Sequence, residues 1–147
     1  MRNSSYTFII LIFGLFIAPG CEKDRNTQDS RVPAVPTDIT INLNLPQYNP
    51  LTNPGGFAYV IGGSRGIVVY RYGLEDFAAF DRHCTYQVEE GCTIEVEEAS
   101  IATDMQCCGS SFEIVNGLPT EGPAIRPLRA YNTQFNPNAN LLRIFNQ

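Results

Sequence analysis

Hydrophobic residues alternate with polar ones most clearly after residue 38 of this chain. Ile39, Ile41, Leu43 and Leu45 are separated by single polar residues, so a strand over 38–45 would place them on one face. Similar short segments follow, rich in Val, Ile, Phe and Tyr and bounded by Gly, Pro or Asn. We predict further strands at 57–61, 66–72, 77–82, 92–97, 100–106, 112–115, 128–135 and 141–145.

The segments between these strands predict turns rather than helices. The stretch 46–56 is dense in Pro, Asn and Gly and predicts a loop, while 62–66 and 138–140 predict tight turns. Only 74–80 allows a helical turn. Many short strands with regular turn signals predict an all-β domain over 38–147, built as a small antiparallel sandwich or barrel.

Residues 1–20 have the pattern of an export signal. Arg2 supplies a positive charge, and the apolar run over 6–18 is shorter than the roughly 20 apolar residues that a membrane-spanning helix needs. The run ends at Ile17-Ala18-Pro19-Gly20-Cys21, which resembles the lipobox of bacterial lipoproteins. That resemblance implies cleavage before Cys21 and a lipid anchor on its thiol. An ordinary secretory signal or an uncleaved anchor is the alternative interpretation.

The stretch after Cys21 is polar and charged, with too little apolar surface to fold alone. We therefore predict a flexible tether over 21–37. Its start, Glu22-Lys23-Asp24, resembles a sorting signal of some outer-membrane surface lipoproteins, and a solvated linker is the other interpretation. We expect the protein in a bacterial cell envelope, lipid-anchored at the outer membrane and facing either the periplasm or the outside.

The charge of the chain bears on its partners. Ten Lys and Arg against fifteen Asp and Glu give a formal net charge of −5 at pH 7. Nucleic acids require clustered Lys and Arg against their phosphates, so this balance argues against a nucleic-acid partner. The expected partners are the membrane, through the lipid on Cys21, and a protein that the sequence does not identify.

Four further cysteines and the single histidine lie close together in the sequence. An even number of cysteines in an exported protein predicts disulfides, and a bond between Cys107 and Cys108 would strain the peptide between them, which leaves two pairings. A Cys₄ zinc site and a non-standard iron–sulfur site are alternatives. A catalytic thiol is a weaker alternative. It would need His83 to reach the thiol of Cys84, but neighbours on a strand point to opposite faces. The five residues are His83, Cys84, Cys92, Cys107 and Cys108.

The stretch 107–131 resembles the second half of the cluster-binding part of Rieske [2Fe–2S] domains. The family pattern there is Cys-x-x-His-Gly-Ser-x-Phe, then an acidic residue, a Gly turn and Gly-Pro-Ala-x-x-Pro-Leu. Upstream, the segment 77–86 resembles the strand that leads into the first ligand motif, Cys-x-His. The resemblance covers about 57–145 and implies a Rieske-like β domain with a cluster-binding-type subdomain at about 84–127. Nine positions match in order: Gly109, Ser110, Phe112, Gly117, Gly122, Pro123, Ala124, Pro127 and Leu128.

The resemblance identifies four positions equivalent to cluster ligands. Cys84 matches the first cysteine, whereas Tyr86 and Cys108 stand where the two histidines should be. Met105 stands where the second cysteine should be. Rieske centres use two imidazoles on one iron, and this chain contains one histidine, so a standard Rieske cluster cannot form within it.

The resemblance also implies how the cysteines pair. Respiratory-chain Rieske proteins join their two ligand loops by a disulfide, at places that correspond to Cys92 and Cys107 here. Cys84 and Cys108 would then face each other across the vacated cluster site, where a second disulfide would replace the metal as the clamp between the loops. The segment 122–128 corresponds to the proline loop that shelters the site in true family members.

Two functions are consistent with these residues. The first is an envelope lipoprotein without cofactor or catalytic residues, structural or partner-binding, with disulfides in place of the cluster. The second, implied by the family alone, is an electron-transfer protein that holds a [2Fe–2S] cluster through altered ligands, with zinc as a less favoured metal. The single histidine favours the first function, and the retained loop motifs keep the second open.

Overall fold

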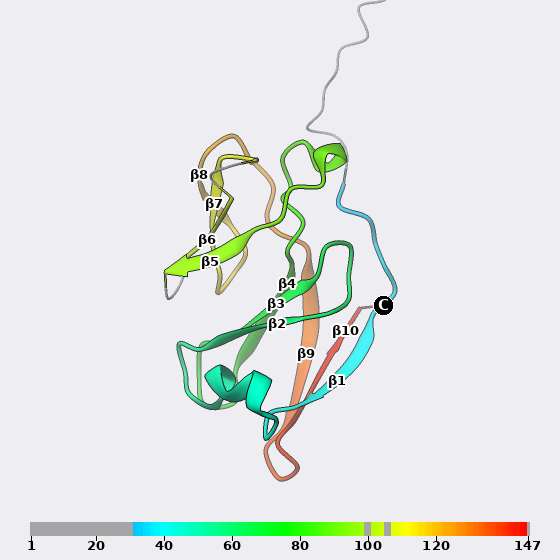
Figure 1. The fold of residues 1–147 in the computed structure, drawn as a ribbon, viewed down its shortest axis with the longest axis vertical. Helices are drawn as coiled ribbons and strands as arrows, with labels where there is room; N and C mark the ends of the chain where they lie inside the picture. The colour runs from blue at the N-terminus through cyan, green and yellow to red at the C-terminus, as the bar shows by residue number, and fades with distance from the viewer. Residues whose placement is uncertain (1–30, 99–100, 105–106, 147) are drawn as a thin grey trace, which may run out of the picture.

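The computed structural model describes residues 31–98, 101–104 and 107–146, which form two antiparallel β-sheets (Figure 1). No helix within these ranges is long and apolar enough to cross a membrane. The two antiparallel sheets confirm the predicted fold class, which was all-β with antiparallel sheets. In chain order the elements are β1 (Asp38–Asn42), η1 (Pro46–Thr52), β2 (Phe57–Val60), β3 (Ile67–Arg71), β4 (Phe77–Asp81), η2 (Val88–Glu90), β5 (Glu95–Glu98), β6 (Ile101–Asp104), β7 (Ser110–Glu113), β8 (Pro119–Glu121), β9 (Ala130–Asn136) and β10 (Leu141–Phe145).

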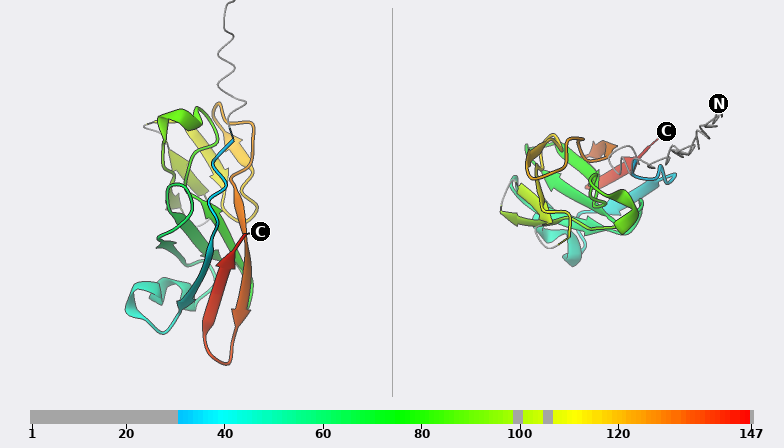
Figure 2. Two further views of the ribbon diagram at one scale, coloured as in Figure 1. Left: turned by 90° about the vertical axis from the view of Figure 1, so that its right-hand side faces the viewer. Right: turned by 90° about the horizontal axis from the view of Figure 1, so that it is seen from above.

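The larger sheet has the strand order β1-β10-β9-β4-β3-β2. Its strands β2, β3 and β4 follow one another along the chain, as do β9 and β10, so most of the pairing is local. The two halves are joined where β4 meets β9, with Ala79 opposite Tyr131 and Phe80 opposite Ala130. Figure 2 shows the β9–β10 hairpin extending away from the smaller sheet, at the opposite end of the molecule.

The central strands β3 and β4 are buried on both faces. Successive residues of a strand point to opposite sides, so Val68 and Phe80 enter one hydrophobic core while Val69 and Ala79 enter another. The second core is closed by η1, β1 and β10. Burial on both faces explains why these strands are continuous apolar runs in the sequence rather than alternating ones.

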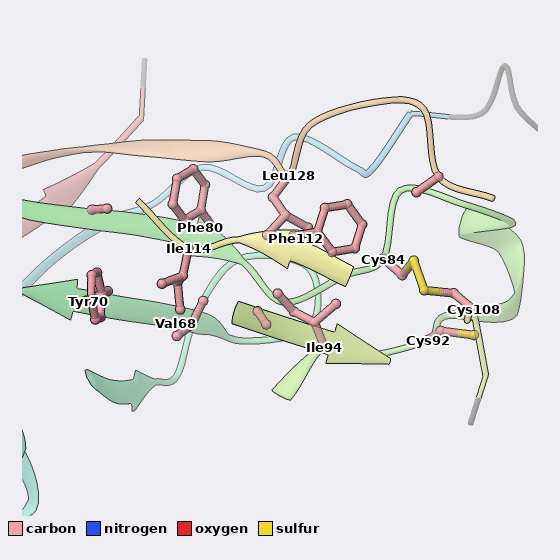
Figure 3. Close-up of a cluster of buried hydrophobic side chains, with 13 residues drawn as sticks. Val68, Tyr70, Phe80, Cys84, Cys92, Ile94, Cys108, Phe112, Ile114 and Leu128 are labelled. Carbon is pink, nitrogen blue, oxygen red and sulfur yellow. A yellow bond between two sulfur atoms is a disulfide. The ribbon is translucent and has the colours of Figure 1, made fainter. Parts of the chain in front are cut away.

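The smaller sheet has the order β5-β6-β7-β8 and covers the first core. Ala102, Phe112 and Ile114 are completely buried there. Figure 3 shows the side chains of this core in a row that ends at the sulfur atoms of Cys84 and Cys108. The cysteines therefore close one end of the core and do not stand apart from it.

Three local predictions differ from the structure. The stretch expected to be a loop over 46–56 contains the helix η1, which begins with Pro46 and buries Leu51 against the second core. The possible helical turn at 74–80 is instead the start of β4, because Phe77 and the residues after it pair with β3. Strand β8 was not predicted, since it has only three residues, begins with proline and pairs with β7 alone.

The segment 31–37 lies along the domain, although the sequence predicted it as the end of a flexible tether. Val32 is buried, and its carbonyl oxygen accepts two hydrogen bonds from the guanidinium of Arg129. Asn146, after β10, donates to the carbonyl of Val35 and accepts from the backbone N–H of Thr37. The Arg129 contacts hold the segment against the loop that leads into β9, and the Asn146 contacts hold it against the end of β10.

Candidate functional site

The first cysteine-bearing loop follows β4. Beyond that strand the chain pairs with itself: the Cys84 N–H donates to the Cys92 carbonyl at 2.9 Å and the Ile94 N–H donates to the Arg82 carbonyl at 2.7 Å. The loop between them contains η2 and ends at Gly91, whose φ of 69° lies in the left-handed region that glycine favours. The pairing therefore places Cys84 and Cys92 side by side at the base of the loop.

The second loop connects the smaller sheet's strands β6 and β7. Gly109 turns the chain there with a φ of 61°, and β7 begins at the next residue, Ser110. This turn brings Cys107 and Cys108, which directly precede Gly109, against the first loop.

Two disulfides join these loops. One links Cys84 to Cys108, with 6.6 Å between their Cα atoms, and the other links Cys92 to Cys107, with 5.7 Å between theirs. These are the two pairs that the family resemblance implies. In Figure 3 the Cys84–Cys108 bond lies at the end of the hydrophobic row, beside Cys92.

The two disulfides differ in their access to solvent. Cys84 is 0% exposed and Cys108 3%, so the whole of their bond lies in the core. Cys92 is 5% exposed, whereas its partner Cys107 is an exposed residue. A soluble thiol can therefore approach the Cys92–Cys107 bond from the side of Cys107.

A third loop, 122–128, covers the two cysteine-bearing loops. The Thr85 hydroxyl of the first loop donates to the Arg126 carbonyl at 2.8 Å, and the Ala124 N–H donates to the hydroxyl of Ser110 at 3.1 Å. Gly122 passes so close to the second loop that a Cβ there would meet the carbonyl oxygen of Gly109. All three loops are thus held together at one end of the molecule, at the top of Figure 1.

The single histidine is a buried structural residue. The Val88 carbonyl oxygen lies 2.7 Å from His83 Nε2 and can only accept, so Nε2 carries the proton. Nδ1 then accepts from the Ser64 hydroxyl, 2.8 Å away. The imidazole thereby ties η2 to the turn between β2 and β3, and neither nitrogen is directed to the sulfur atoms by a hydrogen bond.

Asp81, the last residue of β4, lies beneath these loops and is 0% exposed. Its carboxylate accepts hydrogen bonds from the N–H groups of Ser64 at 2.6 Å, Arg65 at 3.2 Å and His83 at 2.9 Å, and from the Tyr131 hydroxyl at 2.8 Å. Burial raises the pKa of Tyr131, and the hydrogen bond to Asp81 and the charge of that carboxylate raise it further.

The residues present do not fit a Rieske [2Fe–2S] cluster. Such a centre takes two thiolates and two imidazoles, but Cys84 and Cys108 are bonded to each other and His83 is held by Ser64 and Val88. Tyr86, at the position of the first histidine ligand, is partly buried against the core. Within the described residues no group of three or more His, Cys, Asp or Glu is arranged to hold a metal ion. The donor set offers covalent cross-links instead.

Two of the predicted site residues lie outside the described residues. They are Met105, which the resemblance placed at a ligand position, and Cys21, the predicted lipidation site. The sequence did not predict a role for Asp81, although a single carboxylate at the end of the apolar segment 77–81 was a usable signal. The role of Thr85 has no such signal, because its partner is a carbonyl oxygen 41 residues away.

Comparisons with known proteins found similar solved structures. The ferredoxin of carbazole 1,9a-dioxygenase from Nocardioides aromaticivorans IC177 aligns with 78% of this chain and 100% of its own, at 18% identity and a TM-score of 0.45. A chain in the complex of reduced oxygenase and oxidized ferredoxin in carbazole 1,9a-dioxygenase aligns with 63% of this chain and 82% of its own, at 22% identity and a TM-score of 0.42. No family model and no curated protein matches the chain.

Replacing Tyr131 by Phe removes one of the donors to the buried Asp81 carboxylate. We expect Tyr131→Phe to lower the free energy of unfolding at neutral pH by about 1.5–3 kcal/mol, as for other hydrogen bonds to charged groups. Because the pKa of Tyr131 is raised in the folded protein, the wild type also loses stability as the pH rises above 10.0, where the unfolded tyrosine ionises. The variant lacks this loss, so the difference in the free energy of unfolding between wild type and Tyr131→Phe becomes smaller above that pH.

Urea unfolding between pH 7 and pH 11 measures both effects. Tyr72→Phe is the matched control. Because Tyr72 is 48% exposed, we expect this substitution to change neither the free energy of unfolding at neutral pH nor its dependence on pH. A constant difference between wild type and Tyr131→Phe across this range would contradict the account.

The two disulfides should be reduced in a set order. Thiolate attack requires access to a sulfur atom, so the bond that includes the exposed Cys107 should open before the buried Cys84–Cys108 bond. Brief treatment of the folded protein with dithiothreitol, alkylation and peptide mapping should first label Cys92 and Cys107. First labelling of Cys84 and Cys108 would show that the order is wrong, and the urea-unfolded protein, in which both bonds are accessible, is the control.

Proposed function

We propose that this protein is an exported bacterial lipoprotein, anchored at the outer membrane through Cys21, whose Rieske-like domain is a structural or partner-binding module. In this proposal it has no cofactor and no catalytic residue. The main observation that supports the proposal is the buried Cys84–Cys108 disulfide, which joins two positions that the family resemblance equates with cluster ligands.

The chemistry of that bond supports the proposal. A cystine has no thiolate to donate to iron, so a cluster and this disulfide exclude each other at Cys84 and Cys108. The two bonds also make the loops rigid without a metal. On the chain-entropy model, closing loops with sequence separations of 24 and 15 residues stabilises by about 3 kcal/mol each. An oxidising compartment, which export provides, is where such bonds persist.

An exposed side chain at the disulfide-bearing end supports partner binding. Ile125, in the loop 122–128, is 69% exposed, although the loop around it is held by Thr85 and Ser110. A rigid backbone that presents an apolar side chain loses little conformational entropy when a partner covers that side chain.

One purified sample tests the anchor, the disulfides and the metal together. The full chain, produced in a bacterium and extracted from its membranes without reductant, should have the mass of a form cleaved before Cys21 and acylated. Two disulfides should make it four hydrogen masses lighter than the fully reduced protein. Elemental analysis should find no stoichiometric iron or zinc, and the protein should show no absorption bands in the visible range.

Cys21→Ser is the control for the anchor, since it should remove the lipid mass and leave the disulfides unchanged. Near-stoichiometric iron with visible absorption would overturn the proposal in favour of the electron-transfer function with altered ligands. An unacylated mature chain would overturn the membrane anchoring alone.

Partner binding is tested by site-specific photo-crosslinking in the producing bacterium. A photoreactive residue at position 125 should form a discrete crosslinked product, because Ile125 is exposed beside the disulfides. The same residue at position 138, in the hairpin at the other end of the molecule, should not. Equal crosslinking from both positions, or none from position 125, would contradict a partner site at this end.

A further inference from the structure

The two disulfides lie next to each other but differ in what can reach them. Cys84, Cys92 and Cys108 belong to the first hydrophobic core, whereas Cys107 is an exposed residue. Figure 3 shows Cys92 beside the Cys84–Cys108 bond. A bond that a soluble thiol can attack at Cys107 is therefore adjacent to a bond that lies wholly within the core.

The pairing of the chain beyond β4 puts Cys92 directly opposite Cys84. His83 and Thr93 form an antiparallel bridge, and the next pair along this ladder is Cys84 and Cys92, joined by the hydrogen bond from the Cys84 N–H to the Cys92 carbonyl at 2.9 Å. Opposite residues of an antiparallel pair have their side chains on the same face, and hydrogen-bonded pairs have Cα atoms about 5.5 Å apart. Disulfides span Cα separations of roughly 4.4–6.8 Å. The backbone therefore already suits a bond between Cys84 and Cys92.

Opening the exposed disulfide would leave a thiol beside the buried one. Cys92 is 5% exposed, so its released sulfur stays within the core, where the opposite residue on the ladder is Cys84. A reagent from solution has no comparable access, since Cys84 is 0% exposed. Attack from a neighbouring group held in place is far faster than attack by a free reagent, because the two sulfur atoms do not have to meet by diffusion.

We propose that the four cysteines form a thiol–disulfide exchange site that accepts two electrons from a soluble dithiol at Cys107 and passes them to the buried bond. The exchange is stoichiometric and leaves the protein with one disulfide, between Cys84 and Cys92. The inference uses the disulfides and their burial, and does not depend on the lipid anchor or on a protein partner.

The exchange takes place in two stages. A thiolate of the dithiol attacks Cys107 Sγ, the Cys92–Cys107 bond breaks, and Cys92 leaves as a thiolate. The second thiolate of the dithiol resolves the mixed disulfide, so that the reagent leaves as a cyclic disulfide and Cys107 takes up a proton. The Cys92 thiolate then attacks Cys84 Sγ: the Cys84–Cys92 bond forms, the Cys84–Cys108 bond breaks, and Cys108 leaves and takes up a proton. The two electrons and two protons of the dithiol are thereby held as thiols on Cys107 and Cys108.

The exchange changes which loops are covalently joined. Both original bonds link the first cysteine-bearing loop to the second, whereas Cys84 and Cys92 lie in the first loop, eight positions apart in the sequence. One two-electron reduction thus removes both covalent links between the loops. Hydrogen bonds such as that from the Ala124 N–H to the Ser110 hydroxyl then hold the second loop, which gains conformational freedom. The exchange site is consequently a redox switch for the rigidity of this end of the molecule.

The test follows the sulfur pairing after a single reduction. The detergent-solubilised full chain is treated briefly with one equivalent of dithiothreitol, freed of reagent, incubated without denaturant, and alkylated at intervals. Cleavage after glutamate places Cys84, Cys92 and the Cys107-Cys108 pair on three separate peptides, so every bond is identified by mass. We expect label on Cys92 and Cys107 at first. With time the label on Cys92 should be replaced by label on Cys108, while a linked pair of Cys84 and Cys92 peptides appears.

Two single variants that both lose the exposed bond provide a matched comparison. Cys92→Ser leaves its free thiol on the exposed Cys107, and Cys107→Ser leaves it on Cys92, opposite Cys84. Purified without reductant, Cys107→Ser should contain the Cys84–Cys92 bond and a free Cys108, whereas Cys92→Ser should keep the Cys84–Cys108 bond. In dithiothreitol the Cys84–Cys108 bond should open at least about tenfold more slowly in Cys92→Ser than in wild type, because the neighbouring nucleophile is missing.

Three results would overturn the exchange site. The first is label that stays on Cys92 and Cys107, and the second is equal opening of the buried bond in wild type and Cys92→Ser. The third is a mixture that includes bonds from Cys92 to Cys108 or from Cys84 to Cys107, which would show exchange through unfolded chains. These measurements report only sulfur pairing, so failure of the exchange is distinguishable from failure of the anchor or of partner binding.

Discussion

The buried carboxylate of Asp81 joins three parts of the chain that come from different places in the sequence. It accepts from two backbone N–H groups of the turn between β2 and β3, from the backbone N–H of His83, and from the hydroxyl of Tyr131 on β9. A carboxylate with no exposed surface is strongly unfavourable unless its oxygens are hydrogen-bonded, and here four donors satisfy it. The turn, the end of β4 and the start of β9 must therefore be correctly placed together.

The cysteine-bearing loops depend on that arrangement. Asp81 ends β4 only three residues before Cys84, so the direction in which the chain leaves the larger sheet decides where the first loop begins. The Cys92–Cys107 loop is nested within the Cys84–Cys108 loop, and their stabilising effects are consequently not additive. The outer bond belongs to the hydrophobic core, and the inner bond links that core to a solvent-facing residue. Rigidity at this end thus comes from covalent bonds and from the hydrogen bonds of Thr85 and Ser110 to the third loop.

Much of the fold was predictable because the relevant signals are local. The alternation around Ile39 and Ile41 predicted β1, and the apolar runs at 66–72 and 77–82 predicted β3 and β4. The sequence did not predict that β3 and β4 separate two cores, since a short apolar run is compatible with several kinds of burial. The helix η1 was missed because its prolines and asparagines are equally typical of loops, and burial of Leu51 is a tertiary effect.

The candidate site was likewise predictable from the sequence only in part. The strain that a bond between adjacent Cys107 and Cys108 would cause limited the four cysteines to two pairings, and the family resemblance selected between them. Other features required chain segments far apart in sequence to meet: Arg129 reaches Val32 across 97 residues, and Thr85 reaches Arg126 across 41. The sequence by itself determined an acidic, cysteine-bearing β domain, because composition, strand periodicity and donor count are local properties. Only the tertiary structure decided which segment Arg129 holds, which disulfide is buried and which carboxylate organises the loops, because hydrogen bonding and burial depend on packing between distant segments.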